Sequence, residues 1–129
     1  SYEYIIVDNE AGMEHLSRMN LRDIHTLFVV SDPSIRGIVT AARIADLTKA
    51  LKVEVKNKVL VVNRGPKDLP AALEEQIREV VQKTDLLFGE CIPTSEDILQ
   101  SELQQESLLK LSAKTEIVQI ITRFFDKFL

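Results

Sequence analysis

The side chains of this chain that are best suited to chemistry follow short apolar runs. Asp8 comes directly after the apolar residues 4–7, and Gly12 lies four residues further on. A carboxylate on a rigid support suits Mg²⁺, which prefers oxygen ligands, and a glycine lets a phosphate approach the backbone without a Cβ clash. This spacing predicts a magnesium and phosphate contact, with a capping or turn aspartate as the alternative interpretation.

A second candidate follows the apolar residues 58–62. The amide of Asn63 offers one donor and one acceptor together, which is the pattern that an adenine edge requires. A turn asparagine ahead of Gly65 and Pro66 is the alternative on local grounds. The order of these polar groups along the chain favours a nucleotide site over isolated turn residues.

The elements that must position these groups include four apolar runs, at residues 4–7, 26–30, 58–62 and 86–89. None of them alternates polar with apolar residues, which is typical of strands buried on both faces of a parallel sheet. In such a sheet the carboxyl ends of all strands lie at one edge, and ligands bind along that edge. We therefore expect the residues that follow each run to form one site.

The segments between and after these runs have helical spacing. Helices are predicted after a Ser34 cap, from Asp68 with Pro70 in the first turn, from near Ser95, and from about Ser112 to the end. Alternating strands and helices indicate βαβ units. The sequence thus predicts one α/β domain over residues 1–129, with three layers: a parallel sheet of about four strands and flanking helices.

Composition and charge exclude several classes of function. The formal net charge is −4 with interspersed signs, so no basic stripe indicates nucleic-acid binding. Cys91 is the single cysteine, and no cysteine or acidic cluster surrounds His15 or His25 at metal-ligand spacing. The apolar runs are far shorter than the roughly 20 residues that span a bilayer. With no basic leader pattern at the first residues, cytoplasm is the expected location, without an integral membrane segment.

The first motif is familiar in a longer context. Residues 4–18 contain the string Asp8-Asn9-Glu10-Ala11-Gly12-Met13-Glu14-His15. This run resembles the Walker B and switch segment of Mrp/MinD-type P-loop ATPases, and within that class it looks like the nickel-insertion accessory ATPases of carbon monoxide dehydrogenase maturation. The likeness continues in order through residues 30–37, 61–64 and 89–93 and covers essentially the whole chain.

The resemblance implies roles for the residues around the first motif. Asp8 would hold Mg²⁺ through water, and Gly12 would sense the γ-phosphate of ATP. Asn9, Glu10 and Ala11 would form the moving switch. The implied cofactors of the complete protein are ATP and Mg²⁺, and the implied client is a metalloenzyme of the carbon monoxide dehydrogenase type.

The active form of this class is an ATP-sandwiched dimer, so the resemblance also implies self-association. Met13, Glu14 and His15 would then lie near the partner subunit.

On the adenine side, the resemblance implies that Asn63 and Arg64 flank the base and that the backbone around Ile92 and Pro93 closes the site. One departure weakens this loop assignment: the family commonly has an acidic residue soon after its Ile-Pro pair, whereas Thr94 and a serine come first here.

The class depends on a glycine-rich phosphate loop, which this chain lacks, because its four glycines are isolated. A Cys-x-Cys metal pair is missing too. We therefore expect a partial P-loop fold that neither hydrolyses ATP, nor binds it tightly, nor binds nickel by itself. A non-catalytic interaction module that retains the fold is the alternative.

The missing phosphate-loop strand would lie between the strand ending at Asp8 and the strand ending at Ser31. Unpaired strand edges are prone to pairing with other strands. We expect these two strands either to pair directly or to be rejoined by oligomerisation.

Overall fold

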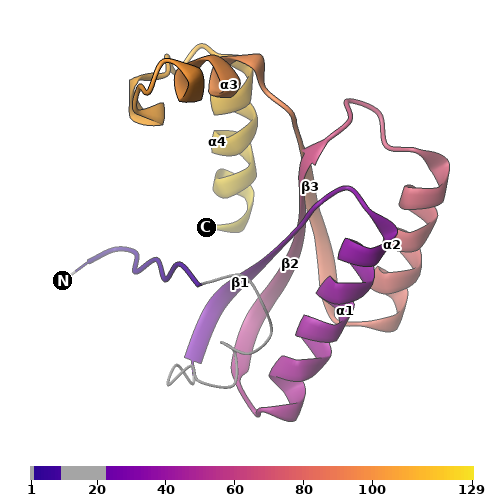
Figure 1. Cartoon of the computed structure of the whole chain (residues 1–129). Helices are drawn as coiled ribbons and strands as arrows, with labels where there is room; N and C mark the ends of the chain where they lie inside the picture. Colours follow the sequence, from indigo (N-terminus) through magenta and orange to yellow (C-terminus); the bar gives the residue numbers. More distant parts are fainter. Residues whose placement is uncertain (1, 10–22) are drawn as a thin grey trace.

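A computed structural model describes residues 2–9 and 23–129 of the chain (Figure 1). Strands and helices alternate from residue 23 to residue 93, and helices follow. In order, the elements are β1 (Asp23–Ser31), α1 (Ile35–Ala50), β2 (Glu54–Gly65), α2 (Ala71–Lys83), β3 (Leu86–Pro93), α3 (Glu96–Leu103), the 3-10 helix η2 (Leu108–Lys110) and α4 (Glu116–Phe128).

The sheet is parallel, with β2 between β1 and β3. Figure 1 shows α1 and α2 on one face of this sheet and α4 on the other. The predicted three-layer α/β architecture is confirmed, and its carboxyl ends share one edge as expected. Within the described residues the sheet has three strands, compared with the four that the apolar runs predicted.

The central strand explains why apolar runs form this sheet. Residues 59–62 of β2 are almost fully buried, and their side chains alternate between the two faces. Leu60 and Val62 join the larger core under α1 and α2. Val59 and Val61 join a smaller core under α4, together with the ring of Phe124. Burial on both sides therefore removes the need for polar positions along β2.

Phenylalanine side chains pack α4 against one face of the sheet. The ring of Phe28 on β1 lies 5.3 Å from that of Phe124 and 5.6 Å from that of Phe125, measured between centroids. Gly89 on β3 makes room for this contact, because a Cβ there would lie 2.7 Å from the Phe124 ring. The absence of a side chain at one strand position thus lets an aromatic ring pack against bare backbone.

The predicted strand at residues 4–7 is wrong for this structure. Residues 2–9 form no strand, and Ile5 and Ile6 are more than four-fifths exposed. A strand needs a neighbour for its backbone hydrogen bonds, and β1, at the sheet edge, pairs only with β2 among the described residues. The expected direct pairing of this run with β1 is therefore also not observed.

Two strand ends differ from the prediction. β2 continues three residues beyond its apolar run, to Gly65, and β3 continues four residues beyond its run, to Pro93. The reason is that the backbones stay paired: Asn63 is the register partner of Ile92, and Gly65 that of Pro93.

Helix starts were predicted with mixed success. Ser34 and Ser95 cap α1 and α3, each accepting a hydrogen bond from a backbone N–H three residues on. Asp68 does not open α2, which begins at Ala71 after Pro70, whose ψ of 144° is not helical. α4 begins later than Ser112, at Glu116.

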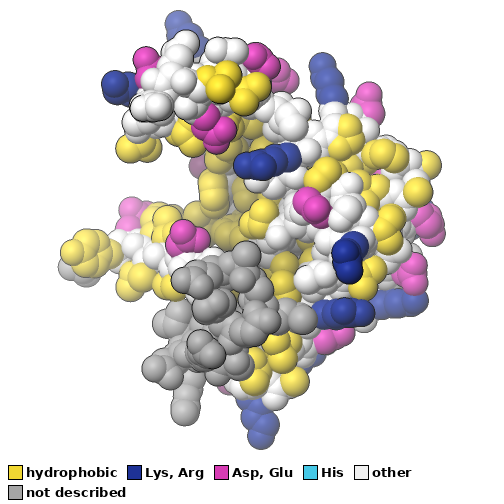
Figure 2. All heavy atoms as spheres, in the orientation of Figure 1, with side chains coloured by type: hydrophobic (Ala, Val, Ile, Leu, Met, Phe, Trp, Pro, Cys, Tyr) yellow, Lys and Arg dark blue, Asp and Glu magenta, His cyan; other side chains and the backbone are white. Residues whose placement is uncertain are grey.

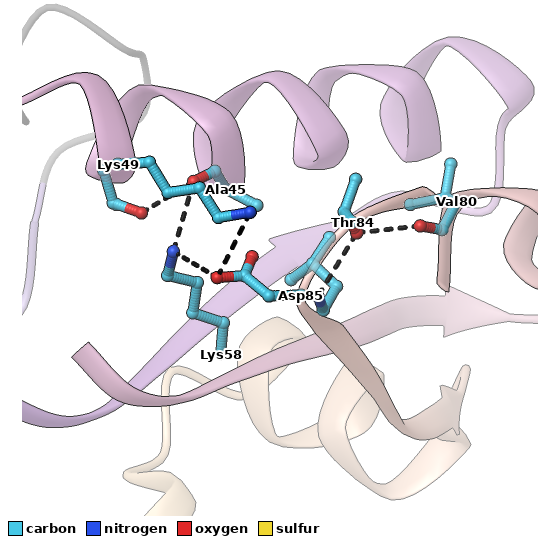
Figure 3. Close-up of polar contacts among 8 residues, drawn as sticks. Ala45, Lys49, Lys58, Val80, Thr84 and Asp85 are labelled. Carbon is cyan, nitrogen blue, oxygen red and sulfur yellow. Dashed lines mark hydrogen bonds and ion pairs between the residues drawn. The ribbon is translucent and has the colours of Figure 1, made fainter. Parts of the chain in front are cut away.

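An ion pair between a buried lysine and a partly exposed aspartate joins three elements at the amino end of the sheet (Figure 3). Lys58 of β2 is 5% exposed, and its Nζ donates to Asp85 Oδ2 at 2.7 Å and to the Ala45 carbonyl at 3.3 Å. Asp85 is 41% exposed, and Lys49 approaches the same oxygen at 3.9 Å. This contact ties β2 to the end of α1 and to the start of β3.

Candidate functional site

The carboxyl edge of the sheet brings together the segments that follow β1 with the ends of β2 and β3. Residues 31–34 connect β1 to α1, residues 63–65 end β2, and residues 92–94 end β3. Polar or exposed groups occur in all three segments. Because this edge is where open α/β sheets bind ligands, we take it as the candidate site.

The first part of the edge is a tight cap at the start of α1. Ser34 Oγ accepts from the Gly37 N–H at 3.0 Å and donates to Asp32 Oδ1 at 2.6 Å. A Cβ at position 37 would overlap the Asp32 carboxylate and the Ser31 hydroxyl. The glycine therefore allows the helix to begin directly against the end of β1, and the Asp32 side chain is fixed by its bond to the capping serine.

An open cleft of about 260 Å³ lies beside this cap, between β1 and α1. Its walls are apolar where Val29, Ala41 and Ile44 contribute, and polar where Asp32 and Arg36 contribute. The sequence prediction gave Asp32 and Arg36 no role. The available signal was the strand-end loop itself, which places both beside the carboxyl end of β1.

The second part of the edge contains the residues predicted for the adenine side. Pairing of Asn63 with Ile92 brings the two predicted segments together, and the Thr94 N–H donates to the Gly65 carbonyl at 3.3 Å. Asn63 is exposed, while Ile92 packs its side chain into the small core under α4. Backbone at Ile92 and an exposed amide at Asn63 thus lie on neighbouring strands.

The end of β2 has an unusual backbone. Arg64 has a φ of 56°, in the left-handed region, and the register between β2 and β3 shifts between Asn63 and Gly65. A non-glycine residue in this region is uncommon and is frequently found where a loop shape is functionally required. The bulge leaves the exposed Arg64 out of the regular strand pairing, between the paired residues Asn63 and Gly65.

The side chain of Cys91 lies directly beside Gly65 in this bulge. A Cβ at position 65 would overlap its Sγ, and its side chain packs against the large core. Burial, with a smaller contribution from the charge of Glu90, raises the pKa of the Cys91 thiol above its ordinary value. The thiol is therefore neutral near pH 7 and acts in packing.

The remaining predicted site residues are not brought to this edge by the described structure. Asp8 and Asn9 are exposed and belong to no helix or strand. Glu10, Gly12, Met13, Glu14 and His15 lie outside the described residues. The predicted magnesium, γ-phosphate and switch contacts therefore stay predictions.

Among residues 2–9 and 23–129, no three His, Cys, Asp or Glu side chains are grouped as ligands of a metal ion. No helix among residues 23–129 combines the length and hydropathy of a bilayer span.

Comparison with known proteins gives three relatives, all from the archaeon Methanocaldococcus jannaschii and all named as uncharacterized ATP-binding proteins. They are 29%, 29% and 30% identical to this chain over 98%, 92% and 94% of its length. The aligned regions cover 48%, 44% and 45% of the relatives. The chain thus spans about half the length of the curated relatives it matches.

No family model matches the chain, and no solved structure matches it significantly. The similarity of this chain to known proteins therefore consists of its matches to these three proteins, whose names describe them as ATP-binding.

Proposed function

We propose that this chain forms the carboxyl-terminal part of an ATP-binding domain, and that its sheet edge at Asn63 and Ile92 holds the adenine. The observation that carries the proposal is the pairing of these two residues on adjacent strands, with the Asn63 amide exposed. The names of the three archaeal relatives support the choice of ATP.

The chemistry of this edge fits a purine base. A side-chain amide offers one donor and one acceptor together, and adenine presents the complementary pair along its edge. The core under α4 holds Ile92 in place, so the backbone next to the base has a rigid support. Preorganised polar groups of this kind orient a ligand without costing much ordering entropy on binding.

The phosphates would be held elsewhere in the domain. Asp8 and Gly12 have the residue types for water-mediated Mg²⁺ and γ-phosphate contacts. We propose that the phosphate loop lies outside residues 1–129, in a part of the protein that corresponds to the unmatched half of the relatives. Bound Mg²⁺ would neutralise phosphate charge, and this chain's contribution would be to position the base.

A finer assignment rests on the resemblance of residues 8–15 to the accessory ATPases. We propose that the complete protein is a Mrp/MinD-type ATPase that serves nickel insertion into a client of the carbon monoxide dehydrogenase type, as a self-associated dimer. Met13, Glu14 and His15 would lie near the partner subunit.

Binding of a fluorescent ATP analogue to the full-length protein tests the adenine assignment. Asn63→Ala should weaken binding about tenfold, since it removes both base contacts of the amide. Asn57→Ala is the matched control, because Asn57 is on β2 at the opposite end of the sheet and should leave affinity unchanged within twofold. Equal effects of the two substitutions would contradict the assignment.

The nickel assignment needs a separate experiment. Purified full-length protein, nickel and ATP should restore activity to a nickel-free carbon monoxide dehydrogenase apoenzyme, and omission of ATP should prevent it. Restoration at the same rate without ATP would contradict the finer assignment while leaving the adenine site intact.

A further inference from the structure

The exposed face of α3 combines leucines with carboxylates. Glu96, Leu99 and Leu103 recur at i, i+3 and i+7, which places them on one face of the helix. Ile98 and Ser101 occupy the other side and are less exposed. Leu103 is 69% exposed, although a leucine of this kind is usually buried.

The chain then turns back so that η2 contacts α3. Gln105 takes a left-handed φ of 55°, and the Glu106 N–H donates to the Ser101 carbonyl at 2.8 Å. Leu109 on η2 is 96% exposed. Figure 2 shows hydrophobic and acidic side chains at the top of the view, with basic side chains beside them. We name the following set the acidic leucine surface: Leu99, Glu102, Leu103, Glu106, Leu108 and Leu109.

The α3 segment and the start of η2 carry a local excess of negative charge. Residues 96–109 contain four of the 20 carboxylates, at Glu96, Asp97, Glu102 and Glu106, and none of the 16 lysines and arginines. Lys110, the last residue of η2, follows this range directly. All four carboxylate residues are exposed.

We propose that the acidic leucine surface binds a basic amphipathic helix of a partner protein. Exposed leucines that are grouped and rimmed by charge mark interaction surfaces, and an amphipathic helix covers such a surface with its apolar face. Basic residues beside that face would complement the carboxylates and speed association. The proposal is independent of the ATP-binding function.

The same charge argues against other occupants. A second copy would bring its own carboxylates against these by two-fold symmetry, with like charges opposed. Nucleic acid and anionic bilayers carry the wrong sign for this surface. A basic helical segment satisfies both the leucines and the charge.

Fluorescence anisotropy with a labelled lysine–leucine peptide, whose leucines lie on one helical face, tests this proposal on the full-length protein. Leu103→Gln/Leu109→Gln and Glu102→Lys/Glu106→Lys should each weaken binding at least about tenfold, as loss of central contacts does. The matched control is Glu74→Lys/Asp126→Lys, which changes two exposed carboxylates elsewhere and should change affinity less than twofold.

Three results would overturn the proposal. The first is an equal loss of binding in the control variant, or none in the leucine variant, which would indicate attraction to overall charge alone. The second is concentration-dependent dimerisation that the leucine substitutions abolish, which would make a second copy the occupant. The third is binding to phosphatidylserine vesicles that the same substitutions abolish. Circular dichroism of each variant checks that the fold is unchanged.

Discussion

Lys58 and Asp85 form an ion pair whose two partners differ sharply in exposure, and this predicts an asymmetric response to mutation. Lys58 is 5% exposed and Asp85 is 41% exposed. Asp85→Ala should leave a buried ammonium with the Ala45 carbonyl at 3.3 Å as its remaining close partner among the described residues. A buried charge without a partner lowers the free energy of unfolding by several kcal/mol. Water can partly enter the vacated position, so we expect Asp85→Ala to lose about 2 kcal/mol.

Lys58→Met should cost much less. Methionine has a similar length and suits the buried position, and Asp85 is exposed enough to be hydrated once its partner is gone. The Ala45 carbonyl still accepts from Thr48 Oγ1 at 2.7 Å. We expect a destabilisation of about 1 kcal/mol or less, because replacing a buried ion partner by an apolar side chain is often close to neutral.

Urea unfolding at pH 7 measures both free energies. The double variant Lys58→Met/Asp85→Ala should be more stable than Asp85→Ala alone, because the orphaned ammonium is removed. As a control, Lys83→Met breaks an exposed pair with Glu79 and should change stability by less than about 0.5 kcal/mol. If Lys58→Met destabilises as much as Asp85→Ala, the reasoning from exposure is refuted.

Three further predictions concern close packing and the thiol. Gly65→Ala should destabilise by about 1–3 kcal/mol through overlap with Cys91 Sγ, and adding Cys91→Ala should recover most of this in thermal unfolding; no recovery would locate the strain elsewhere. Gly89→Ala puts a Cβ 2.5 Å from Val59 Cγ1 and 2.7 Å from the Phe124 ring, so it should destabilise similarly and shift the ring resonances of Phe124 in NMR spectra; unchanged resonances would contradict the packing described. Because the pKa of Cys91 is raised in the folded protein, its stabilising effect is complete below the ordinary pKa of 9.0 and is lost as pH rises through the folded pKa. Above pH 9 the free energy of unfolding should therefore decrease more steeply with pH for the wild type than for Cys91→Ala, and identical slopes would count against this.

The apolar runs predicted β1, β2 and β3 because strands buried on both faces need no polar positions, a property visible in the sequence. The same argument was wrong for residues 4–7, which have an equally apolar composition but no neighbouring strand in the described structure. Strand formation depends on a partner that is distant in sequence. Composition alone does not contain that information.

The candidate site was predicted in part. Asn63 and Ile92 were expected at one edge, and their register pairing confirms that they are neighbours. The bulge at Arg64 was not predictable, since it results from a register shift between β2 and β3. The cleft beside Asp32 depends on how closely α1 approaches β1 through Gly37, and such distances follow from tertiary packing.

A comparison of ATP affinity between residues 1–129 and the full-length protein tests the central claim most directly. Isothermal titration with Mg²⁺ and ATP should give tight, micromolar binding for the full-length protein. Asn63→Ala should weaken that binding. Residues 1–129 alone should bind much more weakly, since this chain contains no glycine-rich phosphate loop. Equally tight ATP binding by residues 1–129, or tight binding by the full-length protein that is unaffected by Asn63→Ala, would contradict the account.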